Sequence, residues 1–225
     1  MKNNKRIFIT GVDTDIGKTF VSVGLCLMLE NKGFNVGYFK PFQSGAYFKE
    51  DKYIAPDVEE LKKYSTNIKT KYSYLFLGDV SPHLASILNN VQVDINKVKK
   101  ELEDFSNEND FVVIEGAGGL YCPAFRGKLF AEVIKELNSE IIIVTTPDLG
   151  RLNHTLMTID CAKQWGIEIK GLIINSMPQV PSLSQENFIK ELKMFTDIEI
   201  LGVIPKLTKL NKQEIVKIFS NINIS

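Results

Sequence analysis

The sequence predicts an α/β fold: one domain over residues 1–225, with a mostly parallel, doubly wound sheet of about six to seven strands and helices on both faces. Two observations predict this fold. Short apolar runs are continuous rather than alternating, which is typical of strands covered on both faces. Longer segments with the helical period separate these runs, and strand–helix–strand units join parallel strands by right-handed crossovers.

Six apolar runs are the expected strands: residues 6–10, 35–40, 110–115, 140–145, 171–175 and 198–204. Helices are expected at 94–106 and over 129–137, because apolar residues recur on one face of each segment, and a further helix at 18–31 follows a glycine-rich loop. Residues 41–93 are less regular, and we expect inserted helices and loops there.

Charge and cysteine usage exclude several classes of protein. Lys+Arg and Asp+Glu both number 27, and this balance argues against a dedicated nucleic-acid binder or a basic membrane-surface protein. Cys26, Cys122 and Cys161 form neither a CxxC pair nor a zinc spacing. No apolar run approaches the roughly 18 residues that span a bilayer, and the start lacks a signal peptide. We therefore expect a cytoplasmic protein that has neither a nucleic acid nor a membrane as its partner.

The polar and glycine-rich segments of the chain follow the expected strands. They are residues 11–19, 40–45, 115–119, 146–153, 175–177 and 205–207. Ligands of doubly wound sheets bind at the carboxyl ends of the strands. The unusual chemistry of the sequence is therefore expected at one edge of the sheet.

Residues 11–19 read GVDTDIGKT and match the phosphate-binding P-loop motif G-x-x-x-x-G-K-[ST]. The motif lies between an expected strand and an expected helix, as a P-loop requires. Lys18 supplies positive charge for the β- and γ-phosphates, and the Thr19 hydroxyl can hold Mg²⁺. Asp13 and Asp15 are unusual beside phosphates, and they indicate that a cationic substrate or the metal is also handled there.

Two of the charged residues, Lys40 and Glu115, follow strands and have two interpretations each. Lys40 can stabilise charge that builds up in phosphoryl transfer, or it can simply extend to water. Glu115 precedes a glycine-rich turn, where P-loop proteins place a second metal-site acid, or it is only a strand-end residue. Asp57 is an obvious helix N-cap.

Three further segments carry weaker signals. Ser81-Pro82-His83 can begin a helix with serine as its N-cap, and we assign His83 no catalysis. The segment 148–155 opens a helix whose N-terminus can bind an anion, or Asp148 or Asn153 merely caps it; His154 is expected to be structural. Asn175 can pair with an adenine edge or serve as a turn residue.

Taken together, these motifs resemble those of ATP-dependent dethiobiotin synthetases. The matching segments are the P-loop, YFKPFQSG at 38–45, SPH at 81–83, EGAGG at 115–119 and LGRLNHTLMT at 149–158. The resemblance runs in order from residue 6 to about 207 and is weakest over 46–80 and 123–132. It implies a cyclo-ligase that converts 7,8-diaminononanoate, CO₂ and ATP into dethiobiotin, ADP and phosphate, with Mg²⁺ as its cofactor.

The resemblance also implies site residues. The implied catalytic residues are Thr14, Lys18 and Lys40. ATP binding is implied for Asp15, Ile16, Gly17, Lys18, Thr19, Phe20, Glu115, Gly118, Asn175, Pro205, Lys206 and Leu207. Metal binding is implied for Thr19, Asp57 and Glu115, and substrate binding for Thr14, Lys40, Ser44, Gly150 and Asn153. Gly150 and Asn153 would come from a second subunit, so a homodimer with its active site at the subunit interface is implied.

An alternative is an ATPase switch of the ParA/MinD type, in which nucleotide controls dimerisation and partner binding. Such a protein shares the expected fold and the P-loop. Its signature is a lysine early in the P-loop, where this chain has Val12 and Asp13. ATP turnover that ignores the diamine would favour the switch.

Overall fold

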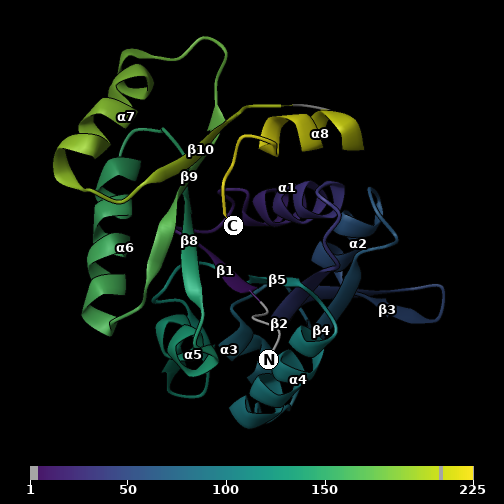
Figure 1. Ribbon diagram of the computed structural model, residues 1–225. Coiled ribbons are helices and arrows are strands. Elements are labelled where there is room, and N and C mark those ends of the chain that lie inside the picture. The colour runs from purple at the N-terminus through teal and green to yellow at the C-terminus, as the bar shows by residue number, and fades with distance from the viewer. Residues whose placement is uncertain (1–4, 208–209, 225) are drawn as a thin grey trace.

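A central sheet with helices on both sides organises the chain (Figure 1), in a computed structural model that describes residues 5–207 and 210–224. The strand order is β10-β9-β8-β1-β5-β2-β3, with β4 also paired to β2. All pairs in this sheet are parallel except β2 with β3. The strands are β1 Lys5–Gly11, β2 Val36–Lys49, β3 Lys52–Ile54, β4 Lys69–Leu77, β5 Phe111–Glu115, β8 Glu140–Thr145, β9 Ile169–Met177 and β10 Ile200–Pro205. The predicted fold class is confirmed.

Two apolar cores lie on the two faces of the sheet. One packs α1 (Lys18–Asn31), α2 (Pro56–Lys62) and α8 (Lys212–Phe219) against side chains such as Ile7 and Ile9. The other packs α3 (Pro82–Leu88), α4 (Ile95–Asn107), α5 (Phe130–Leu137), α6 (Arg151–Trp165) and α7 (Leu183–Phe195) against side chains such as Phe8. Successive strand residues point to opposite faces, and because both faces are buried, the strand sequences are apolar throughout. Within the described part of the chain, no helix is long and apolar enough to cross a membrane.

The less regular region 41–93 differs from its expectation. It contains α2 and α3, but it also holds strand β4 and the second half of β2, which continues to Lys49. β4 reads KTKYSYLFL and has few fully buried residues, because it lies at an edge of the sheet. An edge strand has no continuous apolar run, so the pattern that found the other strands missed this one.

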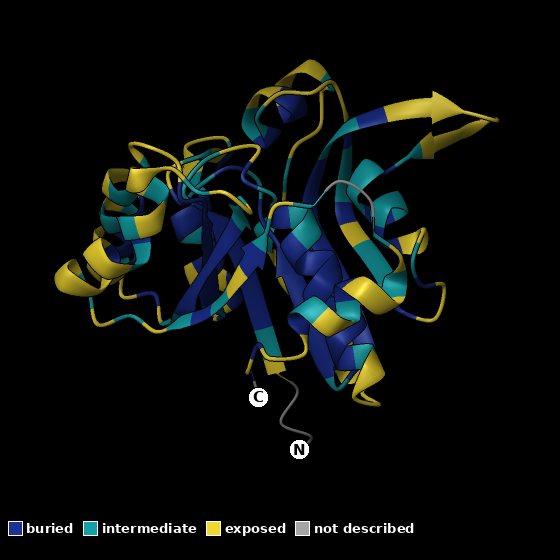
Figure 2. Cartoon of the chain, turned by 90° about the horizontal axis from the view of Figure 1, so that it is seen from above, coloured by how far each residue is buried: buried dark blue, intermediate teal, exposed yellow. Residues whose placement is uncertain are grey.

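Two small hairpins complete the fold. The far end of β2 and β3 form an exposed hairpin that projects from the molecule (Figure 2), with Glu50 and Asp51 at positive φ in its turn. β6 (Pro123–Phe125) and β7 (Lys128–Leu129) form a separate pair just before α5.

Candidate active site

The P-loop connects β1 to α1 at the carboxyl edge of the sheet. Gly17 is the N-cap of α1 and has a left-handed conformation with φ 87°. A Cβ on Gly17 would collide with the side-chain amide of Asn175, which lies on β9. That amide donates a hydrogen bond of 2.9 Å to the Ile16 carbonyl. Glycine is therefore needed both for the turn and for the close approach of Asn175, which fixes the shape of the loop.

The Lys18 ammonium lies inside this loop. Its Nζ donates a hydrogen bond of 2.8 Å to the Asp13 carbonyl. Burial lowers the pKa of Lys18, and the nearby Glu115 carboxylate acts in the opposite direction. Loop N–H groups, a helix N-terminus and an ammonium together suit the oxygens of a phosphate group.

A buried cluster of charges lies beside the P-loop, formed by Thr19, Lys40, Asp57 and Glu115. β2 pairs with β5, with Phe39 opposite Ile114, and this register brings Lys40 beside Glu115. Lys40 Nζ lies 2.8 Å from Glu115 Oε1 and also forms an ion pair with Asp57. The Thr19 hydroxyl lies 2.8 Å from Glu115 Oε1 and 3.1 Å from Asp57 Oδ1. We call these four residues the lysine–carboxylate cluster.

Lys40 and Asp57 keep their charges despite burial. Burial alone lowers the pKa of Lys40, but Glu115 and Asp57 outweigh it and hold that pKa above its usual range. Burial alone raises the pKa of Asp57, but Lys40 outweighs it and holds that pKa below its usual range. Both groups are therefore ionised at neutral pH, and removal of Lys40 leaves Asp57 without its cation.

Two supporting residues were missed by the sequence analysis. The Tyr38 hydroxyl donates a hydrogen bond of 2.7 Å to Glu115 Oε2, and the Gln43 amide donates one of 3.1 Å to Asp57 Oδ2. Tyr38 precedes Lys40 by two residues on β2, so both side chains point to the same face. This strand period is a signal that could have found Tyr38.

The expectation that Asp57 caps a helix is wrong. The N-cap of α2 is Ala55, and no side chain caps this helix. Asp57 lies within the first turn, and its carboxylate turns inward to Lys40 and Thr19. The structure therefore brings Asp57 to the two other residues that were expected to bind metal.

The oxygen atoms of this cluster fit a magnesium ion. Mg²⁺ is held by one or two carboxylates together with substrate phosphates and water. Asp57, Glu115 and the Thr19 hydroxyl are a donor set of this kind. No cluster of three or more His, Cys, Asp or Glu side chains suited to a metal occurs in residues 5–207 and 210–224. A site with only two protein carboxylates leaves coordination positions for phosphate oxygens.

Most of the predicted site residues line one of two cavities. A cavity of about 890 Å³ is lined by residues of the P-loop, β2, α2 and the turn after β5; the predicted site residues among them are Thr14, Asp15, Gly17, Lys18, Thr19, Lys40, Ser44, Asp57, Glu115 and Gly118. We call it the phosphate cavity. A second cavity, of about 320 Å³, is lined by Gly17, Phe20, Tyr64, Asn175, Ser176, Pro205, Leu207 and Leu210. We call it the base cavity. Gly17 lines both cavities, which together suit a nucleotide.

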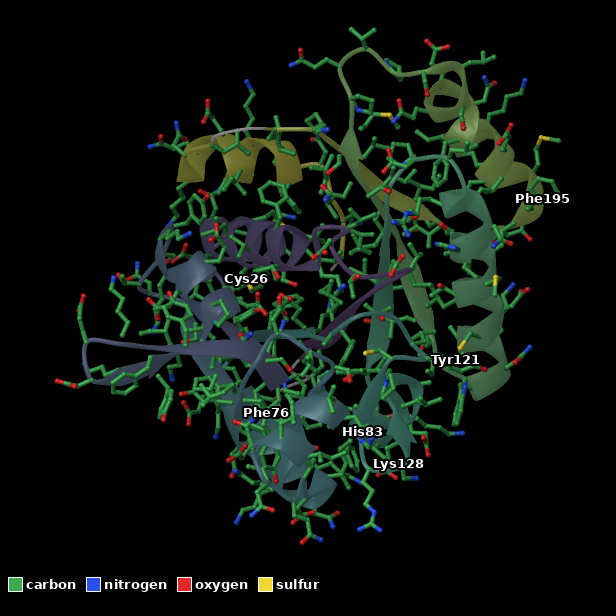
Figure 3. All side chains as sticks on the ribbon, turned by 180° about the vertical axis from the view of Figure 1, so that it is seen from behind. Cys26, Phe76, His83, Tyr121, Lys128 and Phe195 are labelled. Atoms are coloured by element: carbon green, nitrogen blue, oxygen red, sulfur yellow. The ribbon has the colours of Figure 1, made fainter. Side chains whose placement is uncertain are left out.

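A third, more apolar cavity adjoins the phosphate cavity. It measures about 450 Å³, and its lining includes Tyr121 (labelled in Figure 3) and Met157 of α6. Thr14, Gly118 and Cys122 line both this cavity and the phosphate cavity. An apolar group can therefore lie directly beside the P-loop.

Some predicted residues lie apart from the cavities. Gly150 is the N-cap of α6, and Asn153 is exposed, with its amide contacting the sulfur of Met157. Neither residue lines the phosphate cavity or the base cavity. The N–H group of Lys206 donates to the Met177 carbonyl, and this residue lines neither cavity either.

The remaining motif residues have simple surroundings. Ser81 caps α3 by accepting a hydrogen bond from the Leu84 N–H, as expected. His83 (Figure 3) has a buried Nδ1 without a hydrogen-bond partner. His154 is exposed, and its Nδ1 lies 3.1 Å from Arg151 Nη1.

A P-loop at the carboxyl edge of a parallel sheet, with a lysine–carboxylate cluster beside it, defines a P-loop protein that binds a nucleoside triphosphate. Residues 5–214 match a family described as "AAA domain". Curated relatives narrow this class. The chain is 38% identical over 207 residues to the ATP-dependent dethiobiotin synthetase BioD of Caldicellulosiruptor saccharolyticus, covering 89% of this chain and 84% of the relative. It is 34% identical over 218 residues to the enzyme of the same name from Clostridium perfringens strain 13, covering 94% and 95%. The chain belongs to the ATP-dependent dethiobiotin synthetase family.

Solved structures with the same fold are more distant. The septum site-determining protein MinD of Pyrococcus horikoshii, solved with Mg-ADP, matches with a TM-score of 0.64 and 20% identity over 97% of this chain and 93% of that one. A ParA family ATPase of Chlorobium tepidum matches with a TM-score of 0.59 and 14% identity over 97% and 91%. At these identities the likeness concerns the fold alone.

Proposed function

We propose that this protein closes the ureido ring of dethiobiotin from 7,8-diaminononanoate, CO₂ and ATP, and releases ADP and phosphate. The observation that carries the proposal is the single cavity in which the P-loop, Lys40 and the two carboxylates meet. Membership of the dethiobiotin synthetase family supports it. The proposal also assigns roles in this reaction to individual residues.

ATP is proposed to span the two connected cavities. Its triphosphate lies in the phosphate cavity against Thr14, Asp15, Gly17, Lys18 and Thr19, with Gly118 of the opposite turn nearby. Its adenine lies in the base cavity with Phe20, Asn175, Pro205 and Leu207. Ile16 and Lys206 contribute through the backbone.

Thr19, Asp57 and Glu115 are the residues that would hold Mg²⁺. When bound, the ion neutralises charge on the phosphate oxygens. In the structure, the Lys40 ammonium is paired with both carboxylates. We propose that Lys40 turns to the reacting phosphoryl group when the carboxylates are otherwise engaged.

The chemistry needs no activated serine or cysteine. One substrate amine attacks CO₂ and loses a proton, which gives a carbamate. A carbamate oxygen attacks the γ-phosphorus of ATP, ADP leaves, and a carbamic–phosphoric anhydride forms. The second amine attacks the carbonyl carbon, phosphate leaves, and the ring closes with loss of a proton. The protein mainly positions the reactants and stabilises developing charge.

We assign charge stabilisation to Lys18 and Lys40, both of which are buried and lie at the same cavity. Thr14 and Ser44, which line that cavity, are placed to donate hydrogen bonds to the carbamate or phosphate oxygens. Glu115 and Tyr38 hold Lys40 in position before the reaction.

The far end of the substrate is proposed to meet a second copy of the chain. Its carboxylate lies on a long apolar tail, well away from the amines. Gly150 and Asn153 open α6 and line neither the phosphate nor the base cavity. A helix N-terminus with an amide side chain suits a carboxylate. A homodimer in which each copy offers this helix start to its partner completes the proposal.

The test is ADP formation measured with the diamine and bicarbonate present together, separately or not at all, with mass spectrometry of the product. We expect rapid ADP formation and dethiobiotin only when both are present. An ATPase switch of the ParA/MinD kind would release ADP regardless of the diamine. That result would refute the proposed reaction.

A further inference from the structure

Asp13 is an anomaly, because a carboxylate in a phosphate-binding loop repels the ligand. Its Oδ2 accepts a hydrogen bond of 2.6 Å from Arg151 Nη1, and its Oδ1 accepts one of 2.8 Å from the Thr14 N–H. The hydrogen bond from Arg151 is the main cause that holds the pKa of Asp13 below its usual range. Asp13 therefore carries its charge toward α6, away from the phosphate side of the loop.

The backbone of Asp13 also holds the lysine of the P-loop. Its carbonyl oxygen is the acceptor of the Lys18 ammonium, at 2.8 Å. The side chain and the carbonyl of one residue thus join Arg151 to the lysine of the P-loop. The preceding residue is tied to the sheet, because the Val12 N–H donates to the Val144 carbonyl at 3.0 Å. With Val12 fixed, the Asp13 side chain is held by two hydrogen bonds, one from Arg151 and one from the Thr14 N–H.

We infer that Arg151 is a positioning residue for the P-loop: it holds Asp13 so that the loop and Lys18 are preformed for the triphosphate. Arg151 touches neither ATP nor the reacting atoms in this scheme. Without its guanidinium, the Asp13 carboxylate is free to turn toward the bound phosphates, and Lys18 loses a fixed acceptor. The inference rests on the proposed function only for the identity of the nucleotide. Preorganisation of this kind affects binding before it affects chemistry.

His154 and Thr14 complete the surroundings of the pair. His154 Nδ1 faces the same Nη1 of Arg151 at 3.1 Å, and Thr14 donates its N–H to Asp13. The side chains of Arg151 and Asp13 are 25% and 45% exposed, so solvent screens part of their attraction. We therefore expect a moderate effect, of about three- to ten-fold, from breaking the pair.

The experiment is a double-mutant cycle with Arg151→Gln, Asp13→Asn and the double variant. The readouts are the Kd of Mg-ADP by calorimetry and the KM values for ATP and diamine. Arg151→Gln should raise the Kd of Mg-ADP and the KM for ATP by about three- to ten-fold, with kcat changed less than two-fold. Asn at position 13 keeps an acceptor for Thr14, so this variant isolates the ion pair. The double variant should bind Mg-ADP no more weakly than the worse single variant.

The matched control is Arg126→Gln, which removes an exposed arginine from the β6–β7 turn and should leave the Kd unchanged. Multiplicative effects in the double variant would overturn the inference, because they mean that Arg151 acts independently of Asp13. An unchanged Kd of Mg-ADP combined with a higher diamine KM would also overturn the inference. That result would mean that Arg151 helps to bind the diamine and not to position the P-loop. If Arg151→Gln fails to fold, Arg151→Lys, which keeps the positive charge but loses the planar guanidinium, must still weaken Mg-ADP binding. A wild-type protein that binds Mg-ADP but makes no dethiobiotin contradicts the proposed function and leaves this test intact.

Discussion

Helix α1 carries a lysine–carboxylate–hydroxyl network at each end, and the hydrogen-bond distances in the two networks are nearly identical. At its start, Glu115 accepts from Lys40 and Thr19, both at 2.8 Å. At its end, Glu30 accepts from Lys212 at 2.8 Å and from Ser65 at 2.7 Å. The distances alone therefore do not show which network serves the reaction and which only stabilises the fold.

The two networks differ in their burial and in the cavities beside them. Glu115 is 1% exposed and lines a large cavity, whereas the side chain of Lys212 is 42% exposed and lines none of the three cavities at the active site. The first network lies where parallel strands end, and the second joins α1 to α8 and to the loop after α2. The same residue types are therefore assigned to chemistry in one place and to stability in the other by burial and by an open cavity.

Loss of Lys40 should have the largest effect. Lys40→Ala should lower kcat for ADP formation by at least ~100-fold, the scale for losing one preorganised charge stabiliser. Lys212→Ala, its counterpart at the other end of α1, should leave kcat unchanged. Retained turnover in Lys40→Ala, measured on protein with native circular dichroism, would refute the assigned role.

The variant Lys40→Ala also leaves two carboxylates without their cation. Unfolding in urea should show a loss of stability of about 3–5 kcal/mol without ligand. Mg-ADP should restore much of this loss. A deficit that persists with Mg-ADP would mean that Lys40 is mainly structural.

Glu115→Gln tests the metal site. The substitution keeps the shape but removes the charge, and oxygen anions dominate Mg²⁺ binding. The Mg²⁺ concentration for half-maximal activity should rise by about ten-fold or more, whereas Glu30→Gln should not change it. An unchanged Mg²⁺ titration of Glu115→Gln would show that this acid is only a strand-end residue.

Asn153 tests the proposed contribution of the second subunit. Asn153→Ala should raise the diamine KM several-fold, with little change in the ATP KM. Mixing the inactive variants Lys18→Ala and Asn153→Asp should restore activity, because a two-fold interface gives mixed dimers with one intact site. If subunit exchange is demonstrated and no activity returns, both residues serve the same subunit's site.

Glu30→Gln should have the smallest effect. Burial alone raises the pKa of Glu30, but Lys212 and Ser65 outweigh it and lower that pKa. A lowered pKa in the folded state means stability that is present at neutral pH and lost as pH falls through that pKa. We expect Glu30→Gln to lose about 0.5–1 kcal/mol at pH 7 by urea unfolding, and nothing in strong acid. A difference that grows in acid would contradict this assignment.

The contrast between these networks also explains what the sequence could predict. The P-loop, the continuous strands and Glu115 have local patterns, and the structure has them where the sequence indicates. Strand β4 and the inward turn of Asp57 depend on partners distant in the chain, so no local period reports them. The two-residue period of a strand could have indicated that Tyr38 points to the same face as Lys40. The pairing of Arg151 with Asp13 spans 138 positions and has no local signal.

Asn175 contacts both the P-loop and the base cavity, because its amide donates a hydrogen bond to the Ile16 carbonyl and also lines that cavity. A residue that replaces Asn175 to favour another base must also donate a hydrogen bond to the Ile16 carbonyl. Otherwise the P-loop loses this support. Attempts to redesign nucleotide preference at this position will therefore change catalytic turnover along with selectivity. Phe20 and Leu207 line the same cavity with apolar side chains that form no hydrogen bonds, so substitutions there should change base preference with less effect on the loop.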